Sequence, residues 1–302
     1  MTSRSFRAFQ VDTFTTRLFT GNPASVVLDA DALTDAQMRA ITRELGRGDA
    51  AFVQSARGAD HDLYVRFFTP LREAPFIGHA TLAVHVVRSQ LAAGATQRLR
   101  QRSVAGDFEI DVERRGEATH VGVRQPAPTR VRALEHGEVE TLLDALGLGR
   151  ADLDPRCPVE IYGQRSTRLV LAVRSHAALT NLKPDFAALG RLTPHVGAEG
   201  FFVFTLETGA PGFLTEARMF CPAIGIFEDA VSGNAHGMLG TYLVRHDLLR
   251  ADNGVARFRG MQGAVLGRPG EVAIEVWVDK GAPTTVRISG TGVVVFSTTL
   301  TL

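Results

Sequence analysis

Two stretches of the sequence carry the same signature and decide the fold. Residues 66–80 read RFFTPLREAPFIGHA, and residues 218–235 read RMFCPAIGIFEDAVSGNA. Each stretch joins an Arg-x-Phe-x-Pro segment to a Gly-polar-Ala group that opens an apolar helix. The two arginines lie 152 residues apart, about half of the 302-residue chain. Two elements repeated in the same order indicate an internal duplication.

The duplication predicts two similar halves with a cleft between them. The segment that best fits a linker is QPAPT at residues 125–129, because it is rich in proline and lacks an apolar period. Each half is expected to contain a strand, a turn with proline, and a helix that begins at glycine.

Periodicity and capping signals place the other elements. The clearest helix is Asp35–Leu45, preceded by the capping-box pair Thr34 and Gln37 and followed by Gly46. Further helices are predicted over residues 78–91, 138–146, 185–189 and 233–249. Strands are predicted over residues 6–11, 24–28, 63–68, 108–112, 121–123, 168–173, 201–206, 272–278 and 293–296.

The composition argues against several classes of protein. Thirty-three Lys and Arg residues against 32 Asp and Glu residues leave a net charge of +1, so no basic excess favours a nucleic-acid partner. No apolar stretch is long enough to predict a membrane span, and the N-terminus lacks the apolar core of a signal peptide. Two cysteines in 302 residues favour a reducing cytoplasm over a disulfide framework.

Polar residues at the two helix starts suggest chemistry on a small carboxylate. A helix N-terminus offers unpaired N–H groups and a partial positive charge, and small residues let an anion approach it. The two starts are Gly78-His79 and Gly233-Asn234, and Asp229 precedes the second. Asp49 follows the helix that ends at Gly46. Each residue alone also fits an ordinary cap or a solvated turn.

Other chemistries lack their sequence signals. There is no phosphate-binding Gly-rich loop, no dinucleotide fingerprint, no zinc-type Cys or His spacing and no Gly-x-Ser-x-Gly elbow. Neither Cys157 nor Cys221 has a histidine nearby in sequence. The sequence therefore predicts no metal and no cofactor.

The motifs and their order resemble one family. They are FQVDTF at 9–14, GNP at 21–23, FFTP at 67–70, GHATL at 78–82, EDAVSGNAHG at 228–237, QG at 262–263 and GRPG at 267–270. This set is similar to the PhzF-like isomerases of phenazine biosynthesis, which have the diaminopimelate epimerase fold. The resemblance extends over nearly the whole chain.

The resemblance implies an α+β architecture with two pseudo-symmetric halves, each a barrel-like mixed sheet around a central helix. The C-terminal strand returns to the first half, which predicts residues 1–126 with 289–302 as one domain and 127–288 as the other. It also implies cofactor-independent proton transfer beside a carboxylate in the cleft between the halves. The phenazine-pathway member acts on trans-2,3-dihydro-3-hydroxyanthranilate, and homodimers occur in the family.

Site residues follow from the resemblance position by position. The family's catalytic glutamate falls on Asp49, its histidine on His79 and its second carboxylate on Asp229. The position that is usually serine falls on Asn234. With Gly78, Ser232 and Gly233, these residues form the expected catalytic and substrate-binding set.

Two departures from the family pattern matter. Asp49 is one methylene shorter than the usual glutamate, so the position of the backbone or a different substrate must compensate. Related epimerases carry a cysteine at each helix start, where this chain has Ile77 and Ser232. A two-thiol racemase mechanism is therefore not available.

Three functions remain open from the sequence. The first is a PhzF-like isomerase with Asp49 as general base. The second is a paralogue that binds a small carboxylate without catalysis, which the shortened Asp49 motivates. The third is a lyase or epimerase that uses Asp49 and His79 on the same scaffold. The sequence does not name the substrate.

Overall fold

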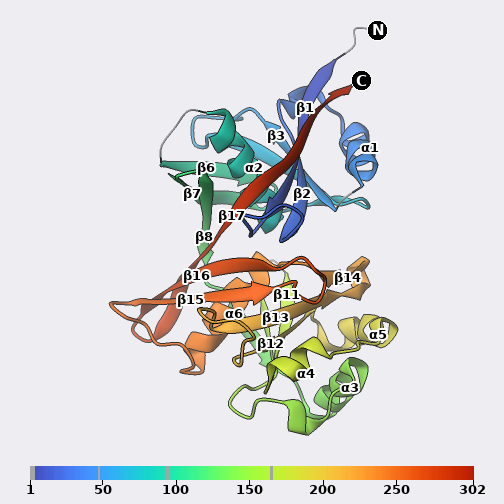
Figure 1. Cartoon of the computed structure of the whole chain (residues 1–302), viewed down its shortest axis with the longest axis vertical. Helices are drawn as coiled ribbons and strands as arrows, with labels where there is room; N and C mark the ends of the chain where they lie inside the picture. The colour runs from blue at the N-terminus through green and yellow to red at the C-terminus, as the bar shows by residue number, and fades with distance from the viewer. Residues whose placement is uncertain (1–3, 47, 93–95, 164–165) are drawn as a thin grey trace. The chain divides into compact units, whose positions relative to one another are not determined.

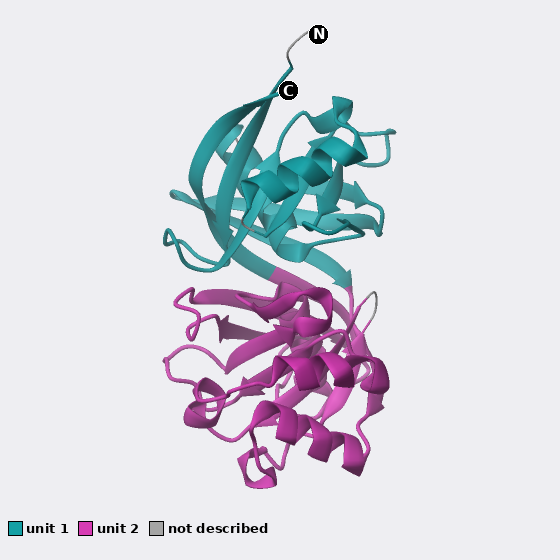
Figure 2. Ribbon diagram, turned by 90° about the vertical axis from the view of Figure 1, so that its right-hand side faces the viewer, with its two compact units in different colours: residues 1–125, 289–302 teal, residues 126–288 magenta. Residues whose placement is uncertain are grey.

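The computed structural model describes residues 4–46, 48–92, 96–163 and 166–302. The chain forms two compact units (Figures 1 and 2). Unit 1 contains residues 1–125 and 289–302, and unit 2 contains residues 126–288. The predicted division placed Pro126 in the first unit, whereas the structure groups it with the second.

Unit 1 is a mixed sheet that closes on itself. Its strands are β1 (Ser5–Thr13), β2 (Asn22–Val27), β3 (Asp49–Gln54), β4 (Leu63–Phe68), β5 (Glu73–Ala74), β6 (Gln97–Ser103), β7 (Gly106–Arg115), β8 (Ala118–Pro126) and the C-terminal part of β17 (Ala282–Thr301). The pairs β2–β3 and β4–β6 are parallel, and β1–β2, β3–β4, β6–β7 and β7–β8 are antiparallel. Because β17 pairs with both β1 and β8, the sheet is barrel-like.

Helix α2 (Gly78–Leu91) is the central helix of unit 1. Eight consecutive residues, Ala80–Val87, are buried. A helix that is apolar on every face must be surrounded by other elements, and α2 packs against β1, β2, β3 and β7. Figure 1 shows α2 beside these strands, as the resemblance implied.

Unit 2 repeats the same order of elements. Its strands are β9 (Thr129–Ala133), β10 (Glu160–Gly163), β11 (Thr167–Val173), β12 (Phe201–Thr205), β13 (Thr215–Cys221), β14 (Ile226–Asp229), β15 (Val255–Gln262) and β16 (Gly270–Asp279). The pairs β11–β12 and β13–β15 are parallel, and β10–β11, β12–β13, β13–β14 and β15–β16 are antiparallel. Strands β1–β7 of unit 1 thus correspond to β10–β16 of unit 2, and the predicted duplication is confirmed.

Helix α6 (Gly233–Arg245) is the counterpart of α2. Residues 235–243 are all buried. Gly240 permits close packing, because an added Cβ would lie 2.9 Å from side-chain carbons of Ile274 and Val276. The prediction extended this helix to residue 249, but it ends four residues earlier, where His246 caps it.

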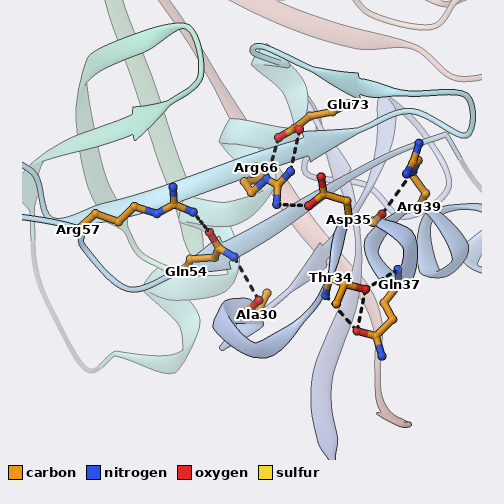
Figure 3. A network of polar contacts seen from close by, with 9 residues as sticks. All are labelled: Ala30, Thr34, Asp35, Gln37, Arg39, Gln54, Arg57, Arg66 and Glu73. Carbon is orange, nitrogen blue, oxygen red and sulfur yellow. Dashed lines mark hydrogen bonds and ion pairs between the residues drawn. The ribbon is translucent and has the colours of Figure 1, made fainter.

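The remaining helices test the local signals. Helix α1 (Asp35–Leu45) has the predicted bounds, and Thr34 and Gln37 form the expected capping box (Figure 3). Helix α3 (His136–Leu146) begins two residues before its prediction. Helix α5 (Phe186–Val196) is capped by Asp185 and continues seven residues beyond its predicted end. A short helix, α4 (His176–Thr180), and the 3-10 turns η1 (Ala30–Ala32), η2 (Arg150–Asp152) and η3 (Pro222–Ile224) complete the chain.

The predicted linker QPAPT is mostly not a loop. Strand β8 runs to Pro126 and β9 begins at Thr129, so only Ala127 and Pro128 lie outside strands. The backbone N–H of Ala127 also donates to the carbonyl of Thr284. Proline is tolerated here because the chain leaves the sheet at this point.

Within the described residues no helix is long and apolar enough to cross a membrane.

Candidate functional site

Asp49 is the first residue of β3. It pairs with Ala24 in the parallel β2–β3 ladder. Ala24 directly follows the Gly21-Asn22-Pro23 motif. The preceding Gly48 has φ +94°, a conformation that L side chains rarely adopt. Asp49 therefore lies at the end of the sheet where the parallel strands β2 and β3 both begin.

The start of α2 brings His79 to this carboxylate. The distance from His79 Nε2 to Asp49 Oδ2 is 3.7 Å, and the two side chains are 14% and 16% exposed. The N-cap residue Ile77 makes no side-chain hydrogen bond to the first turn. The structure therefore unites Asp49, Gly78 and His79 beside a helix N-terminus whose N–H groups no N-cap side chain occupies.

Burial sets the charge state of the histidine. Desolvation lowers the pKa of His79 to about 4, so its imidazole is neutral near pH 7. The separation of 3.7 Å from Asp49 is longer than a hydrogen bond. The carboxyl group of Asp49 thus lies beside a neutral imidazole. The carboxylate can accept a proton, and the ring N–H of the imidazole can donate one.

The second predicted group lies at the start of α6 in unit 2. Asp229 is the last residue of β14 and pairs with Met219. Ser232 is the N-cap of α6, and its Oγ accepts a hydrogen bond of 3.4 Å from the backbone N–H of Ala235. Gly233 and Asn234 begin the first turn. Asp229, Ser232, Gly233 and Asn234 therefore lie on one turn and one helix start.

Gln262, which lies outside the predicted site, contacts this turn at two points. Its Nε2 donates to the carbonyl of Asp229 at 2.7 Å, and its Oε1 accepts from the N–H of Ser232 at 3.0 Å. The motif QG at 262–263 was noted only as part of the resemblance. A contact across 30 residues of sequence has no periodicity by which a sequence could reveal it.

Each unit also contains an equivalent arginine–glutamate ion pair that no sequence pattern predicted. Arg66 on β4 makes a bidentate contact with Glu73 on β5, with both distances 2.7 Å (Figure 3). Arg218 on β13 makes the same contact with Glu228 on β14, at 2.9 and 2.8 Å. The duplicated arginine thus anchors the hairpin that precedes each central helix.

Neither cysteine belongs to the predicted acid–base set. Both are buried and free. Burial raises the pKa of Cys157 to about 11 and that of Cys221 to about 12, so both remain thiols near pH 7.

Among the described residues, no cluster of His, Cys, Asp and Glu has the arrangement of a metal site. A surface pocket of unit 1, lined by Arg7, Asp31 and Arg88 among others, contains none of the predicted site residues.

Two repeated mixed sheets, each packed on a buried helix with polar residues at its start, define a protein of the diaminopimelate epimerase-like fold. A solved hydroxyproline epimerase from Agrobacterium vitis has this fold, with a TM-score of 0.61 and 11% identity over 99% of this chain and 92% of that chain. The Bacillus anthracis phenazine biosynthesis protein of the PhzF family is more similar. Its TM-score is 0.89, with 26% identity over 98% of this chain and 99% of that chain.

The sequence comparisons agree with the structure. The family model described as phenazine biosynthesis-like protein matches residues 11–298. An uncharacterised isomerase from Clostridium acetobutylicum is 38% identical over 99% of both chains. The trans-2,3-dihydro-3-hydroxyanthranilate isomerase of Pseudomonas chlororaphis is 33% identical over 94% of this chain and 95% of its own. The chain belongs to the phenazine biosynthesis-like family of isomerases.

Proposed function

We propose that this protein is a cofactor-independent isomerase that moves a proton between carbons of a small cyclic or amino carboxylate. Asp49 acts as the general base, and His79 and Asp229 complete the acid–base set. Gly78, Ser232, Gly233 and Asn234 hold the substrate. The observation that carries the proposal is the 3.7 Å approach of His79 Nε2 to Asp49 Oδ2 at the start of α2.

The chemistry follows from these groups. Asp49 takes a proton from a carbon near the substrate carboxylate, and the electron pair left behind spreads toward that carboxylate. The N–H groups and partial positive charge of a helix start stabilise the added negative charge. Neutral His79 can donate its ring N–H to the same charge. Protonated Asp49 then returns the proton to another carbon, so atoms and charge balance.

Two considerations support the proposed substrate class: the proton transfer beside a carboxylate and the name of one relative. The Pseudomonas chlororaphis relative is named for a cyclic amino carboxylate, trans-2,3-dihydro-3-hydroxyanthranilate. The shorter Asp49 is consistent with a related substrate whose reacting carbon lies closer to β3. A cytoplasmic location and a homodimer remain predictions for this chain.

The experiment is enzyme-dependent hydrogen exchange in heavy water. A panel of small carboxylates, including trans-2,3-dihydro-3-hydroxyanthranilate, is incubated with the protein and followed by NMR. We expect deuterium uptake at one carbon, and loss of uptake in Asp49→Asn. The matched control is Asp111→Asn, because Asp111 is a comparably shielded aspartate on β7 that pairs with Arg98.

Each outcome decides between the open functions. Full uptake in Asp49→Asn overturns the role of Asp49. Carboxylate binding without any uptake in the wild-type protein favours the non-catalytic binder. Uptake that yields an elimination product or an inverted centre identifies a lyase or an epimerase on the same scaffold.

A further inference from the structure

Helix α6 lacks a local group to complete its N-terminal cap. In α1, the capping box is local, because Gln37 at the third helical position accepts from the N–H of the N-cap Thr34 at 3.0 Å (Figure 3). The third helical position of α6 is Ala235, which has no polar side chain. The N–H of the N-cap Ser232 therefore needs an acceptor from elsewhere in the fold.

Gln262 supplies that acceptor from another strand. It lies at the end of β15, and the residue is 1% exposed. Its Oε1 accepts from Ser232 N–H at 3.0 Å, while its Nε2 donates to the carbonyl of Asp229 at 2.7 Å. One amide group thus closes both ends of the turn from Asp229 to Ser232.

The neighbouring Gly263 allows this approach. Its φ is +89°, and an added Cβ would lie 2.3 Å from the carbonyl oxygen of Arg268 and 2.7 Å from that of Ala230. Any side chain at this position would push β15 away from the turn. The backbone between Gln262 and Arg268 is therefore folded against the turn that Gln262 closes.

We infer that Gln262 is a positioning residue that caps α6 from a distance and so fixes the carboxylate of Asp229 relative to the first turn of the helix. A local glutamate or glutamine at position 235 would lie over the first turn, where the proposed substrate binds. The distant amide satisfies Ser232 from the side of β15 and leaves the N–H groups of Gly233 and Asn234 uncovered by a cap. Because the amide is neutral, it adds no charge beside Asp229. This inference rests on the proposed function.

The test compares Gln262→Met with the matched control Gln54→Met. Gln54 is also buried, and it likewise donates to a backbone carbonyl, that of Ala30, and accepts from Arg57 (Figure 3). It lies at the end of β3 remote from Asp49. We expect Gln262→Met to lower kcat/KM for the exchange reaction 30-fold or more, with a melting temperature within a few degrees of that of Gln54→Met. Gln54→Met should retain wild-type kcat/KM.

Two further measurements separate positioning from folding. Gln262→Glu keeps the acceptor for Ser232 N–H but loses the donor to the carbonyl of Asp229. It also places a negative charge near Asp229, a member of the proposed acid–base set, so it should shift the acid limb of the pH–kcat/KM profile upward. Gln54→Glu should leave this limb unchanged. Gln262→Glu also carries the test if Gln262→Met does not fold. Wild-type kcat/KM in Gln262→Met, or an unmoved acid limb in Gln262→Glu, would overturn the inference.

The inference is decided even if the proposed function fails. Absence of exchange in the wild-type protein refutes the isomerase proposal only. Amide hydrogen exchange, which needs no substrate, then reports on the cap. We expect the Ser232 N–H to exchange at least tenfold faster in Gln262→Met than in wild type or Gln54→Met. Equal protection in the three proteins would show that Gln262 does not hold the turn.

Discussion

Asp49 and Phe201 occupy equivalent positions in the two units. Asp49 begins β3 opposite Ala24 in the parallel ladder, and Phe201 begins β12 opposite Leu169 in the corresponding ladder. Both follow a glycine, Gly48 or Gly200. Duplication thus produced two such strand starts, of which only the one in unit 1 bears a carboxylate. The other became part of a hydrophobic core, in which Phe201 is fully buried.

The burial of Phe201 predicts that position 201, unlike position 49, does not tolerate a carboxylate. Phe201→Asp would bury an unpaired polar group and leave a cavity, so we expect a loss of about 4 kcal/mol or more in the free energy of unfolding. Phe201→Leu is the control, and it should cost about 1–2 kcal/mol because the side chain remains apolar. Urea denaturation measures both. Similar losses in the two variants would show that packing alone determines this position.

Asp49→Glu tests whether activity requires the shorter aspartate side chain or also tolerates a glutamate at this position. General acid–base groups contribute about 10²- to 10⁴-fold to rate, so Asp49→Asn should lose activity on that scale. Asp49→Glu keeps the carboxyl, and the partial exposure of the site leaves room for one methylene. We expect kcat/KM within about tenfold of wild type. A loss as large as that of Asp49→Asn would show that carboxylate placement beside His79 tolerates no such change.

The two arginine–glutamate pairs should differ in their contribution to stability. Arg218 and Glu228 have side-chain exposures of 7% and 9%, whereas those of Arg66 and Glu73 are 15% and 30%. Removing one member of a buried pair leaves the other charge unpaired, at a cost of about 3–5 kcal/mol. We therefore expect Glu228→Gln to destabilise the protein by about 3 kcal/mol and Glu73→Gln by about 1 kcal/mol. Equal losses in urea denaturation would contradict this order.

Buried histidines predict a loss of stability in mild acid. Desolvation lowers the pKa of His85 and of His236 to about 4, against about 6.5 in an unfolded chain. Between these values the unfolded state binds protons that the folded state does not bind. The free energy of unfolding therefore falls as the pH falls from 6.5 to 4, by about 1.4 kcal/mol per pH unit for each such histidine.

His85→Gln tests this pH dependence away from the site. His85 is buried on α2 inside unit 1, and its Nε2 lies 2.9 Å from the side-chain oxygen of Gln101. Urea denaturation at pH values from 6.5 to 4.5 should show that the free energy of unfolding of the variant falls less steeply with falling pH, by about 1.4 kcal/mol per pH unit. An unchanged slope would mean that His85 is protonated in the folded protein.

The sequence by itself determined the local elements and the repeat. Helix α1 was predicted to the residue because Thr34, Gln37 and Gly46 act on neighbours three or four positions away. The start of α2 and its histidine were predictable from the repeated Gly-polar-Ala group that opens each central helix. The end of α6 was misplaced because Leu248 and Leu249 extend the apolar pattern, whereas Asp247 adopts a φ of +56° and the N–H of Leu248 returns to the carbonyl of Leu243.

The tertiary structure alone decided the environment of these residues. Burial makes His79 neutral, and burial is a property of the whole unit rather than of its neighbours in sequence. The contacts of Gln262 with Asp229 and Ser232 join strands that are distant along the chain. Likewise, only the paired ladders show that Phe201 occupies the position equivalent to that of Asp49. Which distant strands pair is a property of the whole fold and not of any local pattern. The sequence therefore predicted the reactive groups, and the tertiary structure decided their geometry and charge state.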